Sequence, residues 1–127
     1  MFADFLDKTC NISRKALTSG RSAFGTRETA PTTVLSNVPC HLEKIMDKDL
    51  LEAYVGGDTK KSLFCVYFDY DTVAGNIRGG DIITMNGNIQ DITPLNQNNE
   101  LVVEDTDNAA GMNHHFEVFA ICRKGVD

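Results

Sequence analysis

The sequence predicts a mainly β protein, a small antiparallel barrel or sandwich of about six strands with one short helix and long loops. Two observations support this fold class. Segments in which apolar and polar residues alternate recur at short intervals, separated by Gly, Asn, Asp and Pro. One segment shows the four-residue apolar spacing of a helix. A chain of 127 residues corresponds to a single domain, residues 1–127, and is long enough for one hydrophobic core.

The N-terminal third is expected to contain two strands separated by a loop. Residues 9–14 (TCNISR) and 34–43 (VLSNVPCHLE) both alternate. Pro39 has no N–H, so the second strand is expected to lie at a sheet edge or to contain a bulge there. The intervening residues 15–33 are rich in Thr, Ser, Gly and Arg, which predicts a long exposed loop or arm. Loops of this length often bind a partner.

Residues 44–61 are expected to leave the sheet as a helix of about two turns. Three side chains at four-residue spacing would form one helical stripe: Met46, Leu50 and Tyr54. Asp49 is the predicted N-cap, with Glu52 as the second half of a capping box. Gly56 and Gly57 would end the helix.

The remaining strands follow from residue 62 onward. Residues 62–70 (SLFCVYFDY) are apolar on both faces, which predicts a central strand that is covered on both sides. Residues 79–92 (GGDIITMNGNIQDI) have two apolar arms around an Asn-Gly pair, which is typical of a β-hairpin. Residues 101–105 and 114–122 are the last two predicted strands.

Two registers remain open for the hairpin. A two-residue type I′ turn at Asn86 and Gly87 would pair Thr84 with Ile89. A three-residue loop with Gly87 in the left-handed conformation would set Ile83 opposite Ile89 instead. The second register opposes two β-branched residues and is slightly favoured.

Composition and charge argue against several classes of protein. The net charge of −6 disfavours a surface that grips DNA or RNA, because such a surface needs a basic patch. No segment approaches the ~18 apolar residues of a membrane span, and the N-terminus lacks the features of a secretory signal, so we expect folding in the cytosol. The cysteines have wide, irregular spacing, which predicts buried, reduced thiols at Cys10, Cys40, Cys65 and Cys122.

The sequence gives little indication of a catalytic or metal-binding site. Adjacent His114 and His115 on a strand would point to opposite faces, so they cannot hold one metal ion together. Two acidic groups are interpreted as turn and strand-end residues rather than acid–base pairs: Asp69, Asp71 and Asp81, and Glu104, Asp105 and Asp107. The sequence contains no serine-hydrolase, phosphate-loop or zinc-protease motif. We therefore expect no enzyme activity, no catalytic residue, no metal and no cofactor.

Several short motifs occur in a characteristic order. An apolar strand runs into an acidic turn, followed by Ile-x-x-Gly-Asp, an Asn-Gly pair and a final strand introduced by Gly and His. The residues concerned are Val66, Tyr67, Phe68, Asp69, Tyr70, Ile77, Gly80, Asp81, Asn86, Gly87, Gly111, His114 and His115. This order, from about residue 9 to 121, resembles the head-closure (stopper) type of head–tail connector protein from long-tailed bacteriophages. The chain departs from the family at Met85, where an aromatic residue is common, and in its long polar stretch 95–110.

The resemblance implies a structural virion protein. Such proteins are small β-barrels that form a homo-oligomeric ring of six- or twelve-fold symmetry beneath the portal and adaptor proteins. The ring seals the DNA-filled capsid and offers the tail its attachment surface. Double-stranded DNA passes through the channel without being bound sequence-specifically. The expected location is the virion neck, after assembly in the host cytoplasm, with no membrane partner.

Within this interpretation three groups of residues receive roles. The excursion at 44–61 is the candidate channel-facing gate: Asp49, Glu52, Tyr54, Gly56, Gly57 and Asp58. The 15–33 arm is the candidate contact to another subunit or to the adaptor: Arg21, Phe24 and Arg27. The residues expected to define the fold are Gly80 and Asp81, which turn the chain into the barrel, and Asn86 and Gly87, which fix the register. Ordinary surface loops are an equally weighted alternative for the first two groups.

Other functions stay open at this point. A tail-terminator or tail-completion ring is the nearest alternative. A small β-barrel nucleic-acid-binding module is the alternative from another class, although the chain lacks a basic stripe with interleaved aromatic residues. A hydrolase or metalloenzyme ranks third.

Overall fold

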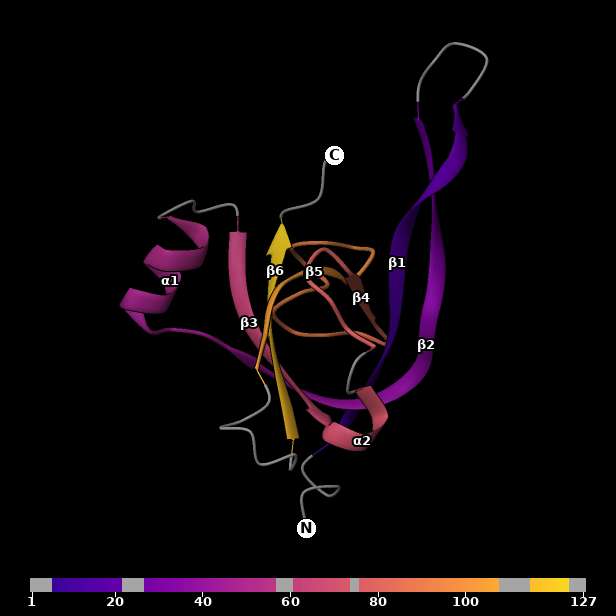
Figure 1. Cartoon of the computed structure of the whole chain (residues 1–127). Coiled ribbons are helices and arrows are strands. Elements are labelled where there is room, and N and C mark those ends of the chain that lie inside the picture. Colours follow the sequence, from indigo (N-terminus) through magenta and orange to yellow (C-terminus); the bar gives the residue numbers. More distant parts are fainter. Residues whose placement is uncertain (1–5, 22–26, 57–60, 74–75, 108–114, 124–127) are drawn as a thin grey trace.

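Six antiparallel strands close into a barrel in the computed structural model (Figure 1). The structure describes residues 6–21, 27–56, 61–73, 76–107 and 115–123. The strands are β1 (Lys8–Arg21), β2 (Arg27–Lys44), β3 (Lys61–Asp69), β4 (Ile82–Met85), β5 (Glu100–Asp107) and β6 (His115–Arg123). Their order around the barrel is β1-β2-β3-β6-β5-β4, and β4 closes the ring against β1. The predicted mainly β class is confirmed.

The barrel interior is filled by alternate residues of the strands. Phe64, Val66 and Phe68 of β3 point into the core, where they meet Val118 and Ala120 of β6. Burial of these side chains is the main stabilising contribution, at about 1.5–3 kcal/mol for each large apolar residue. The opposite face of β3 is also covered, because two of its residues there are fully or almost fully buried: Leu63 and Cys65. This confirms the predicted central, doubly covered strand.

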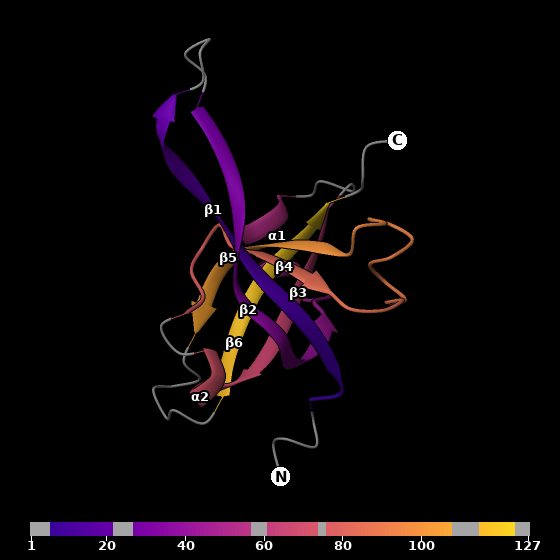
Figure 2. The same ribbon diagram turned by 90° about the vertical axis from the view of Figure 1, so that its right-hand side faces the viewer.

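Strands β1 and β2 continue beyond the barrel as a two-stranded ribbon (Figures 1 and 2). Lys15 pairs with Pro31, and Leu17 pairs with Thr29. Of the two forms predicted for residues 15–33, a loop or an arm, the loop was therefore wrong. Residues 22–26 lie outside the described part of the chain. The ribbon leaves the barrel, so no core imposes strict alternation on its sequence. Threonine-rich segments suit a strand as well as a loop.

A bulge in β2 marks the point where the ribbon joins the barrel. The register moves from Val38 opposite Cys10 to Leu35 opposite Ile12. Asn37 adopts a positive φ of 52°, and its N–H donates a 2.8 Å hydrogen bond to Oδ1 of Asn11. The bulge lies two residues before Pro39. Pairing with β3 begins at Cys40, so Pro39 itself has only β1 beside it among the described strands. The predicted edge or bulge at Pro39 agrees with this local arrangement, although β2 as a whole pairs with both β1 and β3.

The predicted hairpin over residues 79–92 does not form, and both proposed registers were wrong. β4 pairs with β5 instead, with Ile83 opposite Leu101 and Thr84 opposite Glu100. A type I′ turn requires positive φ at both central residues. Only Gly87 has it, at 87°. Asn86 and Gly87 therefore start a long loop and do not set the register of a hairpin.

The loop over residues 86–99 folds onto the barrel and contributes to its core. Ile89 and Ile92 are buried in it. The loop is held by internal hydrogen bonds: Ile89 N–H to Thr93 Oγ1 at 2.8 Å, Thr93 Oγ1–H to Asn99 Oδ1 at 2.6 Å, and Asn99 Nδ2–H to the Gly87 carbonyl at 2.7 Å. Side-chain bonds also attach it to β1 and β6. Asn86 Nδ2 donates to Thr9 Oγ1 at 3.0 Å, and Asn96 Nδ2 donates to the Arg123 carbonyl at 3.2 Å.

Two helices complete the fold. Helix α1 (Lys48–Val55) is the predicted two-turn helix, but its N-cap is Asp47, which accepts N–H bonds from Asp49 and Leu50. Asp49 was thus the wrong cap, because the helix begins at Lys48, two residues before the start that a cap at Asp49 implies. Met46 of the predicted stripe precedes the helix and is 73% exposed. Gly56 ends α1 in the left-handed conformation, with φ of 59°. The four-residue α2 (Tyr70–Val73) was not predicted.

Candidate functional site

The base of the ribbon is fixed to the barrel by an ion pair. Nε and Nη2 of Arg14 donate to Oδ1 and Oδ2 of Asp81 at 2.9 and 3.0 Å. The Arg78 N–H also donates to Oδ2, at 2.9 Å, and Arg14 reaches the Asn76 carbonyl at 3.3 Å. The hydrogen bonds that Arg14 donates to Asp81 raise the pKa of Arg14 above its ordinary value. A bidentate guanidinium–carboxylate pair fixes direction as well as distance, so it orients the ribbon.

Gly80 and Asp81 lie where the chain enters β4. Gly80 has a φ of 89°, which favours glycine, and its N–H donates to the Val103 carbonyl at 2.7 Å. The Val103 N–H donates back to the Asp81 carbonyl at 2.8 Å. Sequence reasoning missed Arg14, the partner of Asp81. The two residues are 67 positions apart, and only the register of β1 against β4 brings them together.

The outer part of the ribbon has two strand edges without a neighbouring strand in the described residues. β4 covers β1 only at residues 10–13, and β3 covers β2 only at residues 40–44. Beyond these points β1 and β2 pair with each other, as far as Arg21 opposite Arg27. Unpaired edges expose backbone donors and acceptors to another chain. We call residues 15–31 the arm.

The arm is basic, whereas the rest of the chain is acidic. Residues 15–31 contain three cationic residues, Lys15, Arg21 and Arg27, and one anionic residue, Glu28. The arm thus carries a net charge of +2, and the remainder carries −8 of the total of −6. The two predicted arm arginines lie at the ends of the described strands, directly opposite each other. Phe24, the third predicted contact, lies outside the described residues.

An acidic strip crosses the outside of the barrel. It comprises Glu43 on β2, Glu117 on β6 and three residues of β5: Glu104, Asp105 and Asp107. Asp107 lies directly opposite Glu117 in the β5–β6 ladder. Burial, together with the negative charges of Glu117, Glu43 and Asp107, raises the pKa of the Cys65 thiol to about 12. Carboxylates from three strands therefore act on the same region of the barrel.

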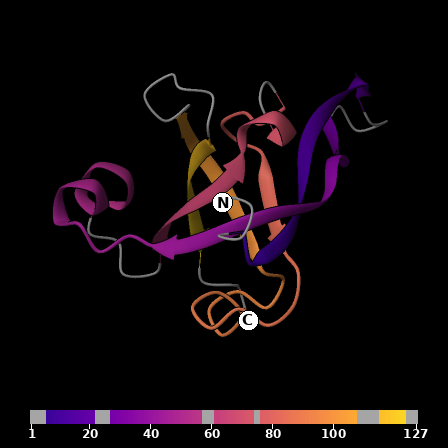
Figure 3. The same ribbon diagram turned by 90° about the horizontal axis from the view of Figure 1, so that it is seen from below.

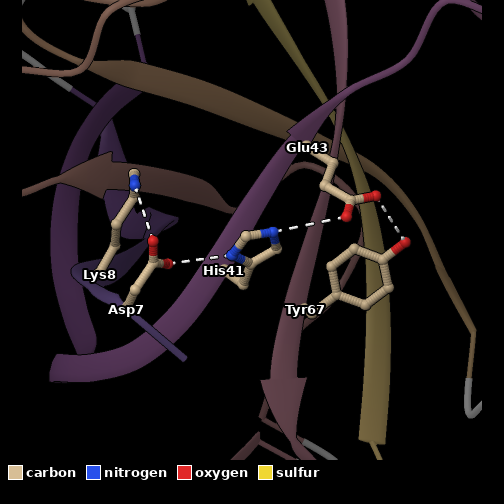
Figure 4. A network of polar contacts seen from close by, with 5 residues as sticks. All are labelled: Asp7, Lys8, His41, Glu43 and Tyr67. Carbon is tan, nitrogen blue, oxygen red and sulfur yellow. Dashed lines mark hydrogen bonds and ion pairs between the residues drawn. The ribbon is translucent and has the colours of Figure 1, made fainter. Parts of the chain in front are cut away.

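A polar network extends the acidic strip towards the N-terminus (Figure 4). Asp7 Oδ1 and Glu43 Oε1 flank the His41 ring, at 3.0 Å from Nδ1 and 3.5 Å from Nε2. Tyr67 donates to Glu43 Oε2 at 3.3 Å, and Lys8 donates to Asp7 Oδ2 at 3.2 Å. The hydrogen bond to His41 lowers the pKa of Asp7. Both ring nitrogens of His41 face carboxylates, so the imidazole is not positioned as a general base. The network instead joins β2 and β3 to the residues at the start of β1.

Helix α1 packs on the same outer face through Tyr54. The Tyr54 ring stacks on Phe119 of β6, with ring centroids 5.6 Å apart and an interplanar angle of 14°. Its hydroxyl donates to Asp105 Oδ2 at 3.1 Å. Burial first, and the bond to Asp105 second, raise the pKa of Tyr54. α1 has no buried residue, so it is held on the barrel by partly exposed contacts such as this one.

The candidate gate residues divide between α1 and the segment after it. Asp49 and Glu52 are exposed on the helix, Tyr54 faces the barrel, and Gly56 is the C-cap. Gly57 and Asp58 lie outside the described residues. Figures 1 and 3 place α1 and the ribbon on opposite sides of the barrel, so the candidate gate and the arm are separate surfaces.

The cysteines and histidines form no metal-binding group in the described part of the chain. All four cysteines are buried and free, as predicted. His115 begins β6 and its ring lies 6.0 Å from that of Tyr67, while His114 lies outside the described residues. No helix in the described segments is long and apolar enough to cross a membrane.

Comparisons with known proteins show the fold alone. No protein-family model matches the sequence, and no curated protein matches it. Among solved structures, the chain is similar to the solution structure of protein SF1141 from Shigella flexneri 2a. The TM-score is 0.60 at 12% sequence identity, over 100% of this chain and 99% of the other. The chain therefore shares its overall fold with a solved structure, and this similarity does not indicate an activity.

Proposed function

We propose that this protein is a ring-forming head-closure component of a bacteriophage head–tail connector. In this role it seals the DNA-filled capsid beneath the portal and adaptor proteins and supplies the tail attachment surface. The observation that carries the proposal is the arm, a two-stranded ribbon whose outer edges lack a neighbouring strand in the described residues. The order of motifs from the apolar strand to Asn86 and Gly87 supports it through the resemblance to stopper proteins.

The closed barrel limits how copies can associate. A closed sheet has no edge at which a second barrel could add a strand. The longest unpaired strand edges of the described residues lie where β1 and β2 extend beyond the barrel, and β5 also lacks a β4 partner from Glu104 to Asp107. Contacts between an arm and a different surface of the next copy are heterologous, and repetition of such contacts by rotation closes into a ring. This geometry favours a ring over a symmetric pair.

The acidic barrel fits a channel through which DNA passes. Outside the arm the chain carries a net charge of −8. A negative wall repels the phosphate backbone, so it guides DNA without holding it. In this proposal α1 and the residues after it form the gate. Its attachment through Tyr54 to Phe119 and Asp105 is small enough to be released without unfolding the barrel.

Assembly with neck components tests this function. The protein is mixed with DNA-filled capsids that carry portal and adaptor, and separately with isolated tails, and ring formation is followed by negative-stain electron microscopy and mass photometry. We expect rings on the capsids and retention of DNA after tail-less capsids are challenged with nuclease. Rings on tails alone would indicate a tail-terminator protein instead. Failure to form rings in both mixtures would contradict a connector role.

A further inference from the structure

A hollow of about 200 Å³ lies on the outer face of the barrel, where the neighbouring strands β3, β6 and β5 meet. Its lining residues are Lys61 of β3, Ile121 and Arg123 of β6, and Val102 and Glu104 of β5. In the β3–β6 ladder Lys61 lies directly opposite Arg123. In the β5–β6 ladder Val102 lies directly opposite Ile121. Because residues that face each other in a ladder project from the same side of the sheet, the strands themselves build this hollow.

Two of the lining side chains are aliphatic. Val102 is 37% exposed, and it is one of two large apolar side chains that are exposed in the described residues. Ile121 is almost buried and lies outside the cluster that fills the barrel interior. An apolar group that covers these two side chains would remove apolar surface from water, which favours binding. The hollow therefore suits a ligand that has an apolar part.

The charged part of the lining is cationic overall. Lys61 is the first residue of β3 and Arg123 is the last residue of β6, so both lie at one end of their ladder. With the carboxylate of Glu104 the lining has a net charge of +1, from two cations and one anion, against −6 for the whole chain. Like charges that face each other destabilise a strand pair. A ligand carboxylate beside both cations would offset this repulsion, and the guanidinium group offers it two parallel N–H donors.

We propose that the hollow binds an α-carboxylate whose carbon also carries a branched apolar side chain and an N–H group. The ligand carboxylate lies between Lys61 and Arg123. Its side chain packs on Val102 and Ile121, and its N–H donates to the carboxylate of Glu104. A hollow of about 200 Å³ is smaller than the ~300–1,000 Å³ of pockets for drug-sized molecules, so it takes one residue and not a longer segment. A free amino acid and the carboxyl end of a polypeptide both present this group.

An inorganic anion matches only part of this lining. Phosphate would pair with Lys61 and Arg123, but it would place additional negative charge beside Glu104. It would also leave Val102 and Ile121 in contact with water. A carboxylate that is attached to an apolar side chain should therefore bind more tightly than phosphate. This site goes beyond the head-closure role, because no contact between copies of the chain enters it.

Titrations of isotope-labelled protein followed by nuclear magnetic resonance test the site. The probes are leucine, N-acetyl-leucine, the peptide Gly-Gly-Ala-Leu with a free carboxylate, the same peptide as its amide, and inorganic phosphate. We expect the carboxylate probes to shift the backbone amide signals of residues 102–104 and 121–123 saturably, with dissociation constants of about 1 mM. The peptide amide and phosphate should bind at least about tenfold more weakly, because the amide lacks the charge and phosphate lacks the apolar part.

The two sources of the ligand group are distinguished by its nitrogen. Tighter binding of leucine than of N-acetyl-leucine would show that an ammonium group pairs with Glu104, which identifies a free amino acid. Equal or tighter binding of N-acetyl-leucine and the peptide acid would identify the carboxyl end of a polypeptide. Binding of the peptide amide or of phosphate as tightly as the peptide acid would overturn the proposal. The absence of any saturable shift below about 20 mM would overturn it too.

Variants of the lining locate the bound group. Arg123→Gln and Lys61→Gln each remove one cation and should weaken binding of the peptide acid at least about fivefold. Val102→Ser keeps the charges and should weaken the same binding by removing apolar contact. Lys48→Gln, at an exposed position of α1 outside the lining, is the matched control and should bind as the wild type does. Circular dichroism establishes that each variant is folded. Wild-type binding by both Arg123→Gln and Lys61→Gln would place the ligand elsewhere and refute the site.

Discussion

Asp81 is only 2% exposed, yet it accepts two hydrogen bonds from Arg14, which lies on the strand that leads into the arm. The carboxylate is paired and hydrogen-bonded, as a buried charge must be. Because the partner is on β1, the same ion pair that stabilises the entrance to β4 also fixes the direction of the ribbon. Stability and arm orientation are thus linked at one residue.

Replacement of Asp81 by Asn is expected to lower the free energy of unfolding by about 2–4 kcal/mol. The amide keeps the size of the side chain but removes the charge that Arg14 and the Arg78 N–H bind. Urea denaturation measures the change. Asp91→Asn, at an exposed loop position, is the control and should change stability by less than about 0.5 kcal/mol. Equal stability of the two variants would show that the ion pair contributes nothing to the fold.

Replacement of Tyr54 by Ala is expected to release α1 while the barrel stays folded. The substitution removes the stacking on Phe119 and the bond to Asp105, with a loss of about 1–2 kcal/mol. Hydrogen exchange should become faster across residues 48–55 and remain slow in β3. Tyr54→Phe keeps the ring and should preserve most of the protection. Slow exchange throughout α1 in Tyr54→Ala would mean that other contacts hold the helix.

Gly87→Val is expected to cost about 1–2 kcal/mol without unfolding the barrel. Gly87 has a φ of 87°, which a β-branched residue adopts only with strain, although no atom lies within 4 Å of the added Cβ. The register of β4 is set by β1 and β5, so it should not shift. Circular dichroism and thermal melting provide the measurement, with Asn88→Val as the control. Loss of the β-sheet signal would show that the loop determines the fold.

The contact between Asp7 and His41 is expected to stabilise the protein at neutral pH and to be lost in acid. The pKa of Asp7 is lowered in the folded state from its ordinary value of 3.8. The contribution is therefore fully present above about pH 4 and disappears as the pH falls through the lower folded value. Because Asp7 is 52% exposed, we expect only a few tenths of a kcal/mol.

A comparison of Asp7→Asn with the wild type tests this dependence. Denaturation curves recorded between about pH 7 and pH 2 should show a small difference in stability at neutral pH that vanishes at the acid end. In a His41→Gln background, Asp7→Asn should cause a smaller difference, since the first of the two partners of Asp7 is gone and only Lys8 remains. A difference that grows on acidification has the opposite sign and would contradict the interpretation.

Strong local patterns were predictable from the sequence, and long-range relationships were not. The strand around Phe64 was clear because both of its faces are buried. The sequence of residues 15–33 indicates a loop or an arm and not a strand pair, because no core imposes alternation on it. Asn86 and Gly87 indicated a hairpin, but the favourable pairing of Ile83 with Ile12 and Leu101 outweighed the local turn. Among the predicted site residues, Arg21 and Arg27 lie opposite each other in the β1–β2 ladder. The Arg14–Asp81 pair and the acidic strip were not predicted, because only the pairing of distant strands brings their residues together.

The loop over residues 86–99 also couples the two ends of the described chain. Through Asn86 it holds Thr9, near the start of β1, and through Asn96 it holds Arg123, at the end of β6. Fraying at one terminus therefore loosens a segment on which the other terminus depends. Unfolding from the ends should consequently be cooperative, with the first and last strands losing protection together rather than one after the other.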